Sequence, residues 1–119
     1  MKFTIERYIL FCKDMQGVTA FYSDVLGLKP SIRTDTPASE WVELGTKAFR
    51  LALHKASNPG SKGSNRNKIV FRVDDVGAAR EYLLDHGVRM GKHNHWAHAD
   101  ACDGKDPEGN VFQITGPKS

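Results

Sequence analysis

Apolar residues recur at helical spacing in two stretches, one in each half of the chain. In the first half they fall at i, i+3, i+4, i+7 and i+8, which places them on one helix face: Val18, Phe21, Tyr22, Val25 and Leu26. In the second half the apolar face consists of Val76, Ala79, Leu83 and Leu84. We therefore predict two amphipathic helices.

Both predicted helices carry start and stop signals. Asp14 can accept hydrogen bonds from the first backbone amides of the first helix, and Asp74 or Asp75 can do the same for the second. Gly27 and Gly87 can each supply the left-handed residue that commonly ends a helix. These signals predict helices that begin after the aspartates and end before the glycines.

Short segments rich in β-branched and aromatic residues flank both helices and predict strands. One precedes each helix, at residues 8–11 and 69–73. Three follow each helix: residues 29–35, 40–44 and 49–54 in the first half, and 89–94, 99–103 and 111–115 in the second.

The two halves repeat each other in register. Asp14 and Asp74, Tyr22 and Tyr82, and Gly27 and Gly87 are each separated by 60 residues. Each half thus reads as strand, helix and three strands, and such a unit alone buries little surface. We predict a single α+β domain over residues 1–119, made of a βαβββ unit at 1–57, a polar connection at 58–66 and a second unit at 67–117.

Composition narrows the class of protein. Hydrophobic residues make up 39% of the 119 residues and charged residues 26%, as in globular proteins. No apolar run approaches the roughly 20 residues of a membrane span, and the first residues lack the apolar core of a secretory signal. Cys12 and Cys102 form no disulfide pattern, and the net charge of +3 is small. We expect a cytoplasmic protein that binds neither membrane nor nucleic acid.

Two motifs suggest a family. Residues 21–28 (FYSDVLGL) resemble the first-helix signature of the vicinal-oxygen-chelate superfamily of glyoxalases, bleomycin resistance proteins and extradiol dioxygenases. Residues 106–114 (DPEGNVFQI) resemble its closing turn and last strand. The resemblance covers essentially the whole chain. It implies a curled mixed sheet that forms a cup, with helices outside, a small-molecule ligand inside and a homodimer.

The resemblance also locates the positions that hold the metal ion in metal-using relatives. They fall on Arg7, Ala52, Lys68 and Gln113. Strand alternation agrees, since Leu51, Leu53, Phe112 and Ile114 would then face the helices. Arginine, alanine and protonated lysine offer no metal-binding lone pair, and Gln113 alone could ligate. We therefore expect no metal at these positions and no cofactor.

The remaining side chains of the predicted cup suit a polar or aromatic ligand. Arg50 and His54 share the predicted face of Ala52, and Trp41 and Phe49 could form aromatic walls. Arg7 and Lys68 would have little carboxylate near them in the cup and could attract an anion. The alternative is that Glu6, Glu43 or an acid of a partner subunit pairs with these cations in a purely structural role.

Histidine and cysteine residues are further candidates for metal binding or catalysis. His93 and His95 would share one face of an extended segment and could hold zinc or copper with His98 or Asp100. They lie outside the positions that the resemblance assigns to a metal, so a solvated or ligand-rim role is the expectation. His86 is placed to complement the dipole of the second helix. Cys102 has no base in a fixed relation to it and is expected to be a packed strand residue.

Three functions remain open at this stage. The first is a glyoxalase/bleomycin-resistance-like protein that binds a small anionic or aromatic molecule in a metal-free cup without turnover. The second is an enzyme that uses Arg7, Lys68, His54 or Gln113 for electrostatic or acid–base work. The third is a metal-dependent lyase, isomerase or dioxygenase-like enzyme whose ligands lie elsewhere. Nothing in the sequence names the substrate.

Overall fold

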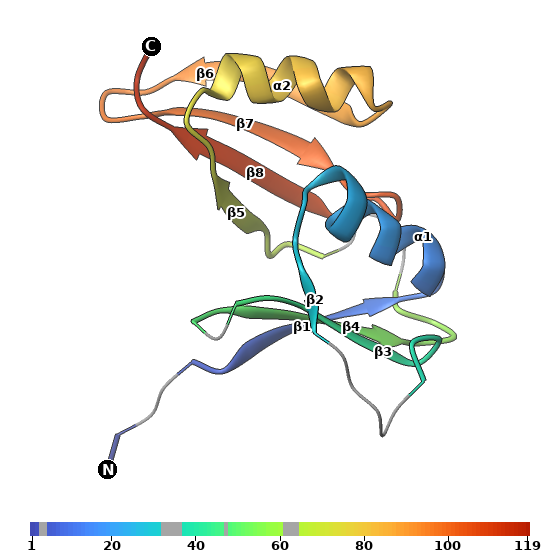
Figure 1. The fold of residues 1–119 in the computed structure, drawn as a ribbon. Helices are drawn as coiled ribbons and strands as arrows, with labels where there is room; N and C mark the ends of the chain where they lie inside the picture. The colour runs from blue at the N-terminus through green and yellow to red at the C-terminus, as the bar shows by residue number, and fades with distance from the viewer. Residues whose placement is uncertain (3–4, 32–36, 47, 61–64) are drawn as a thin grey trace. The chain divides into compact units, whose positions relative to one another are not determined.

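The chain forms two compact units, each with its own sheet and helical segment (Figure 1). The computed structural model describes residues 1–2, 5–31, 37–46, 48–60 and 65–119. Unit 1 spans Met1–Pro59 and unit 2 spans Gly60–Ser119.

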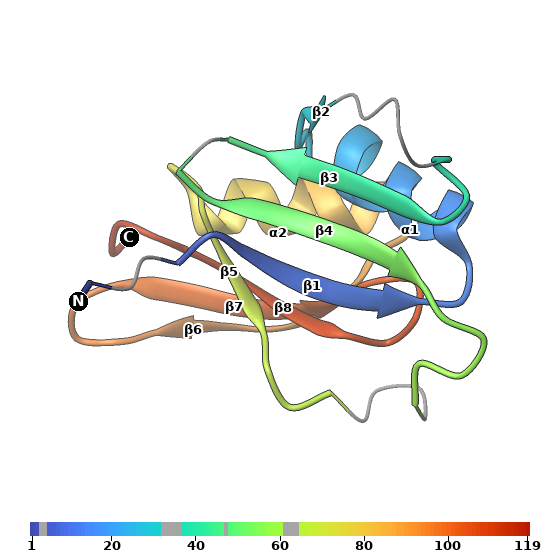
Figure 2. The same ribbon diagram turned by 90° about the horizontal axis from the view of Figure 1, so that it is seen from below.

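Unit 1 is a four-stranded mixed sheet with one helical segment on one face. Its elements are β1 (Arg7–Cys12), α1 (Met15–Ala20), η1 (Phe21–Val25), β2 (Pro30–Ser31), β3 (Trp41–Gly45) and β4 (Arg50–Lys55). The strand order is β1-β4-β3-β2, with β1 parallel to β4 and the other neighbours antiparallel. Figure 2 shows β3, β4 and β1 side by side in front of α1. Of the predicted strand at residues 29–35, residues 32–35 lie outside the described part of the chain.

Unit 2 repeats this topology. Its elements are β5 (Ile69–Arg72), α2 (Val76–Asp85), β6 (Arg89–His95), β7 (Asp100–Lys105) and β8 (Val111–Gly116). The order is β5-β8-β7-β6, and again only the first pair is parallel. The predicted α+β fold of two βαβββ units with mixed sheets is confirmed. None of the helices in the described ranges is long and apolar enough to cross a membrane.

The predicted helix signals are confirmed, and the structure decides between the two aspartates of the second helix. The side chain of Asp14 accepts a hydrogen bond from the Gly17 amide at 3.0 Å. In unit 2 the cap is Asp75, whose Oδ1 accepts from the Ala78 amide at 2.9 Å. Gly27 and Gly87 adopt φ values of +77° and +76°, the left-handed conformation that ends a helix.

Two details of the helices differ from the prediction. The first helix widens into a π-turn at η1, where the Leu26 amide bonds to the Phe21 carbonyl five residues back. In α2, Leu84 does not belong to the buried face, since it is 39% exposed. The half-buried Arg80 lies on that face instead, and its Nε donates to the Gly91 carbonyl at 2.9 Å.

Each sheet has one face covered by its own helix and one that the helix leaves free, called here the helix-free face. Side chains alternate between the faces. Leu51 and Leu53 are buried on the α1 side of β4, and Phe112 and Ile114 on the α2 side of β8, as predicted. The helix-free faces therefore carry Ala52 and Gln113.

Candidate functional site

The residues predicted for the site in unit 1 gather on the helix-free face of its sheet. Strand register places Arg7 beside Arg50, and Trp41 beside His54. Ala52 lies between them on the same face and is fully buried. The structure thus brings together the five unit 1 positions that the sequence proposed.

Three rings lie side by side across β1, β4 and β3 and are called here the aromatic row: Phe11, His54 and Trp41. The ring centroids of Phe11 and His54 are 5.4 Å apart, and those of Trp41 and His54 are 5.3 Å apart. Phe11 is 50% exposed. The sequence analysis did not include Phe11, although strict alternation from Arg7 through Ile9 would have placed it on this face.

Phe49 is not part of the aromatic row. It precedes β4 in the turn after β3, where its carbonyl accepts from the Thr46 amide at 3.0 Å. His54 and Trp41 lie at the opposite end of the strand pair. His54 lies four residues after Arg50 along β4, which corresponds to about 13 Å of strand. The prediction of Trp41 and Phe49 as a pair of aromatic walls is therefore wrong for Phe49, and Phe11 lies with Trp41 instead.

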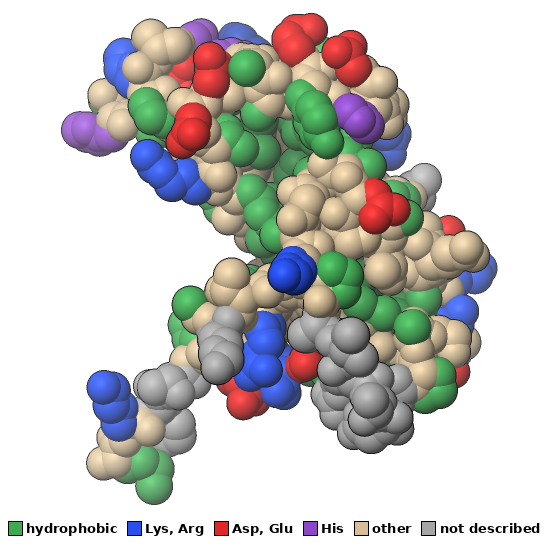
Figure 3. Space-filling model, in the orientation of Figure 1, with side chains coloured by type: hydrophobic (Ala, Val, Ile, Leu, Met, Phe, Trp, Pro, Cys, Tyr) green, Lys and Arg blue, Asp and Glu red, His purple; other side chains and the backbone are tan. Residues whose placement is uncertain are grey.

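Carboxylates neutralise the arginines at the other end of this face. Arg7 Nε lies 3.1 Å from Glu43 Oε1, and Arg7 Nη2 lies 3.0 Å from Glu6 Oε2. Arg50 Nη2 lies 3.7 Å from Glu6 Oε1. Figure 3 shows basic and acidic side chains together beneath this sheet. Of the two interpretations, the structure shows the one in which Glu6 and Glu43 pair with Arg7, because register places the buried Glu43 opposite the small Ala52, where Arg7 reaches it.

Unit 2 repeats this arrangement. Lys68 Nζ lies 3.2 Å from Asp103 Oδ2, and the Gln113 side-chain amide donates to Asp103 Oδ1 at 2.9 Å. Asp103 and Gln113 are register partners, as Glu43 and Ala52 are in unit 1. Because Glu43 and Asp103 are 60 residues apart, the internal repeat of the sequence could have identified these two acids as equivalent positions.

The residues at the superfamily's metal positions do not fit a metal ion. Arg7 and Lys68 are cations held in ion pairs, and Ala52 has no donor atom. Gln113 offers only its amide oxygen. A divalent ion needs several converging oxygen, nitrogen or sulfur ligands, which these four positions do not supply.

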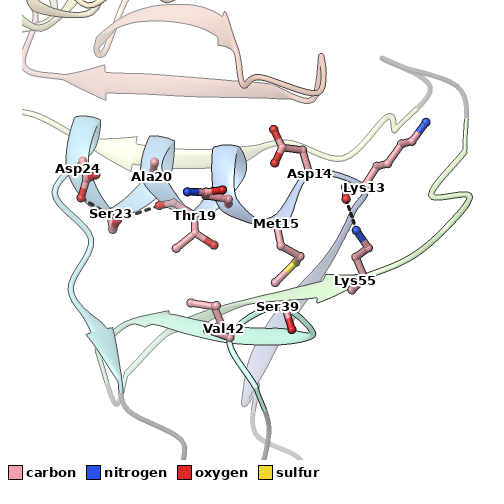
Figure 4. Close-up of a pocket in the computed structure, with 12 residues that line it drawn as sticks. Lys13, Asp14, Met15, Thr19, Ala20, Ser23, Asp24, Ser39, Val42 and Lys55 are labelled. Carbon is pink, nitrogen blue, oxygen red and sulfur yellow. Dashed lines mark hydrogen bonds between the residues drawn. The ribbon is translucent and has the colours of Figure 1, made fainter.

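Hollows also open on the described surface away from the aromatic row. One of about 370 Å³ lies beside β6 and β7 and is lined by Arg89, Asp103 and Lys105, among others. Another, of about 680 Å³, lies between α1 and β3 (Figure 4). Its polar groups serve the fold: Lys55 Nζ donates to the Lys13 carbonyl, and Asp14 caps α1. None of the residues that line it is aromatic, and no motif in the sequence indicated this hollow.

The histidine pair, His93 and His95, lies on the α2 side of the unit 2 sheet, opposite its helix-free face. His93 Nε2 is 2.9 Å from Asp100 Oδ2, and His95 Nδ1 is 3.1 Å from Asp100 Oδ1. His98 is exposed in the turn before β7. Asp100 is 1% exposed, and the hydrogen bond from the Ser119 hydroxyl, together with those from His93 and the Ser119 amide, holds its pKa well below the usual value. Of the two third ligands considered, His98 and Asp100, it is therefore Asp100 that contacts both histidines.

Cys102 and His86 have structural roles, as expected. Cys102 is fully buried in β7, and burial raises the pKa of its thiol. His86 caps the C-terminus of α2, and its Nδ1 lies 2.8 Å from the Tyr82 carbonyl oxygen.

Comparison with known proteins agrees with this architecture. The chain has the fold of TnmS3, an antibiotic binding protein from Streptomyces sp. CB03234 (TM-score 0.80, 22% identity, 98% of both chains covered). It also has the fold of a lactoylglutathione lyase from Agrobacterium tumefaciens (TM-score 0.71, 20% identity, 95% and 92% covered). A glyoxalase/bleomycin resistance protein from Streptomyces sp. CB03234 is similar too (TM-score 0.73, 22% identity, 91% and 96% covered).

Sequence comparison identifies the family. None of the proteins of curated function matches the chain. Residues 4–114 match the sequence profile of the Glyoxalase/Bleomycin resistance protein/Dioxygenase superfamily. This match covers nearly the whole chain, so the chain belongs to that superfamily.

Proposed function

We propose that the protein binds a small aromatic molecule, without metal, on the helix-free face of the unit 1 sheet. The observation that carries this proposal is the aromatic row, in which the exposed Phe11 and the half-buried Trp41 and His54 can stack on a flat ligand. The adjacent arginines and glutamates balance in charge, so the face suits a ligand with both hydrogen-bond donors and acceptors.

Arg50 is the side chain best placed to select an acidic group on the ligand. Its Nε is buried and has no hydrogen-bond acceptor within the described residues. Its ion pair with the exposed Glu6 is long, at 3.7 Å. Arg7, in contrast, is committed to the buried Glu43. An acceptor on the ligand would thus contact Arg50 before Arg7.

The similarity to TnmS3 makes sequestration of an aromatic antibiotic a concrete form of this proposal. In this form the protein acts by stoichiometric binding in a cytoplasmic homodimer, as the superfamily resemblance suggests. Lys68, Gln113 and Asp103 form the equivalent polar group on the unit 2 sheet and are proposed as further ligand contacts. A metal-dependent lyase that uses the four superfamily metal positions lacks support, because these positions carry too few donors; a lyase with ligands elsewhere is left to a turnover assay.

Titration calorimetry with naphthalene-1-sulfonate and the neutral 1-naphthalenemethanol tests this proposal. Trp41→Ala should weaken both probes by about tenfold, the loss of one stacked ring. Trp96→Ala is the matched control, since Trp96 lies in the β6–β7 turn of unit 2, and it should leave both affinities unchanged. Arg50→Gln should weaken the sulfonate more than the alcohol. Equal affinities for wild type and Trp41→Ala would refute the site.

A turnover assay separates the lyase alternative. We expect no S-lactoylglutathione from methylglyoxal and glutathione in the presence of Zn²⁺ or Ni²⁺. Product formation that depends on added metal would replace the binding proposal with an enzymatic one.

A further inference from the structure

We propose that His93, His95 and Asp100 form a zinc-binding site on the α2 side of the unit 2 sheet. Among the described residues, these three offer one ligand atom each, and the atoms all lie within 4.8 Å of one another. The site lies on the opposite face of the sheet from Lys68 and Gln113 and is separate from the superfamily's metal positions.

The distances are close to those of a bound ion. Zinc binds histidine nitrogen and carboxylate oxygen at about 2.0–2.2 Å, so tetrahedral ligand atoms lie about 3.3 Å from each other. His93 Nε2 lies 2.9 Å from Asp100 Oδ2 and His95 Nδ1 lies 3.1 Å from Asp100 Oδ1, so each histidine is already near this distance from one of the two carboxylate oxygens. The histidine rings stack with centroids 4.3 Å apart and 24° between their planes, so their nitrogens reach the same carboxylate. Small ring movements would complete the geometry.

A β-bulge brings the histidines to this face. Met90 pairs with Gly104, whereas His93 pairs with Cys102, so β6 has one extra residue between Met90 and His93. Without that residue, alternation would turn His93 and His95 away from Asp100. The bulge is held in place, because the Gly91 carbonyl accepts from Arg80 Nε at 2.9 Å and from Cys102 Sγ at 3.3 Å.

The supporting contacts orient the carboxylate, while one histidine of the cluster is exposed. Ser119 donates to Asp100 Oδ2 through its hydroxyl at 2.6 Å and its amide at 3.3 Å. Oδ1 faces His95, whose side chain is 56% exposed. Three protein ligands with one side open to solvent match the pattern of zinc sites that keep a water as the fourth ligand. Figure 3 shows histidine side chains at the surface of unit 2.

Zinc titration of chelator-treated protein tests the site. Calorimetry should give one Zn²⁺ per chain. His95→Ala should weaken binding by more than about tenfold, a loss typical of a disrupted metal site, and the exposed side chain makes this variant safe for folding. His93→Ala should behave in the same way. His98→Ala is the matched control from the same segment and should bind zinc as the wild type does.

Cobalt substitution gives a second measurement. Co²⁺ bound at this site should show the visible absorption of a four-coordinate ion, and this absorption should be lost in His95→Ala but retained in His98→Ala. The proposal is overturned if the wild-type protein binds no zinc, or if His93→Ala and His95→Ala bind it as tightly as the wild type. In either case the cluster would be a hydrogen-bonded support of the sheet only.

Discussion

At the scale of single residues, two ion pairs occupy equivalent places in the units but differ in burial. Arg7 pairs with Glu43, whose side chain is 6% exposed, whereas Lys68 pairs with Asp103, whose side chain is 46% exposed. A buried charge that loses its partner is strongly destabilising, whereas an exposed pair contributes little. The same motif is therefore expected to support the fold in unit 1 and to remain available to a ligand in unit 2.

Arg7→Ala should lower the free energy of unfolding by about 2 kcal/mol or more, because it leaves Glu43 buried without its cation. Lys68→Ala should change it by less than about 1 kcal/mol. Urea unfolding measures both. In the double variant Arg7→Ala/Glu43→Gln much of the loss should be recovered. Equal effects of the two single variants would show that burial does not distinguish the pairs.

The Cys102 thiol should react slowly with a disulfide reagent in native Cys12→Ala protein, which retains this one cysteine. Burial both shields the sulfur and raises its pKa, so less thiolate is present than at an ordinary cysteine. Accordingly, the labelling rate of Cys102 in native protein should still rise with pH in a range where the labelling rate of the urea-unfolded chain no longer changes. Rapid labelling of native protein at neutral pH would contradict a packed Cys102.

At the scale of elements, much of the architecture follows from local signals. Period-2 and period-3.6 patterns, aspartate caps and left-handed glycines predicted the helices and strands, because each depends on neighbouring residues alone. Strand register depends instead on hydrogen bonds between distant segments. The sequence analysis therefore missed the bulge in β6, which turns His93 toward Asp100. It also missed the aromatic row, which needs Phe11 and Trp41 aligned on His54.

Neighbouring aspartates at the start of α2 provide a test of capping. Asp75→Ala should destabilise the protein by about 1 kcal/mol, because it removes the acceptor for the Ala78 amide. Asp74→Ala changes the same charge but leaves the cap, and should cost less than about 0.5 kcal/mol. Chemical denaturation of both variants measures the difference, and a larger effect of Asp74→Ala would contradict the assigned cap.

At the scale of the whole molecule, duplication explains what the helix-free faces share and where they differ. Each unit places a cation from its first strand region against an acid from its third strand. Within the described residues, unit 1 adds the aromatic row and unit 2 adds the histidine cluster on its other face. The two units therefore share one scaffold, and sequence differences between them account for the different chemistry proposed for each.

Sedimentation or light scattering should give twice the 13.2 kDa of one chain, since the superfamily resemblance implies a homodimer. Exposed apolar side chains on the sheets, Ile9, Phe11 and Val70, are consistent with further burial in an assembly. A mass of one chain across the accessible concentration range would contradict this prediction.

The most direct test of the proposed function is to locate a bound probe by intermolecular nuclear Overhauser effects. With naphthalene-1-sulfonate in fast exchange, contacts are predicted between its ring protons and the ring protons of Phe11, His54 and Trp41. The account would be contradicted if the probe contacted other residues in place of the aromatic row, such as Trp96, or Met15 and Val42 in the hollow between α1 and β3.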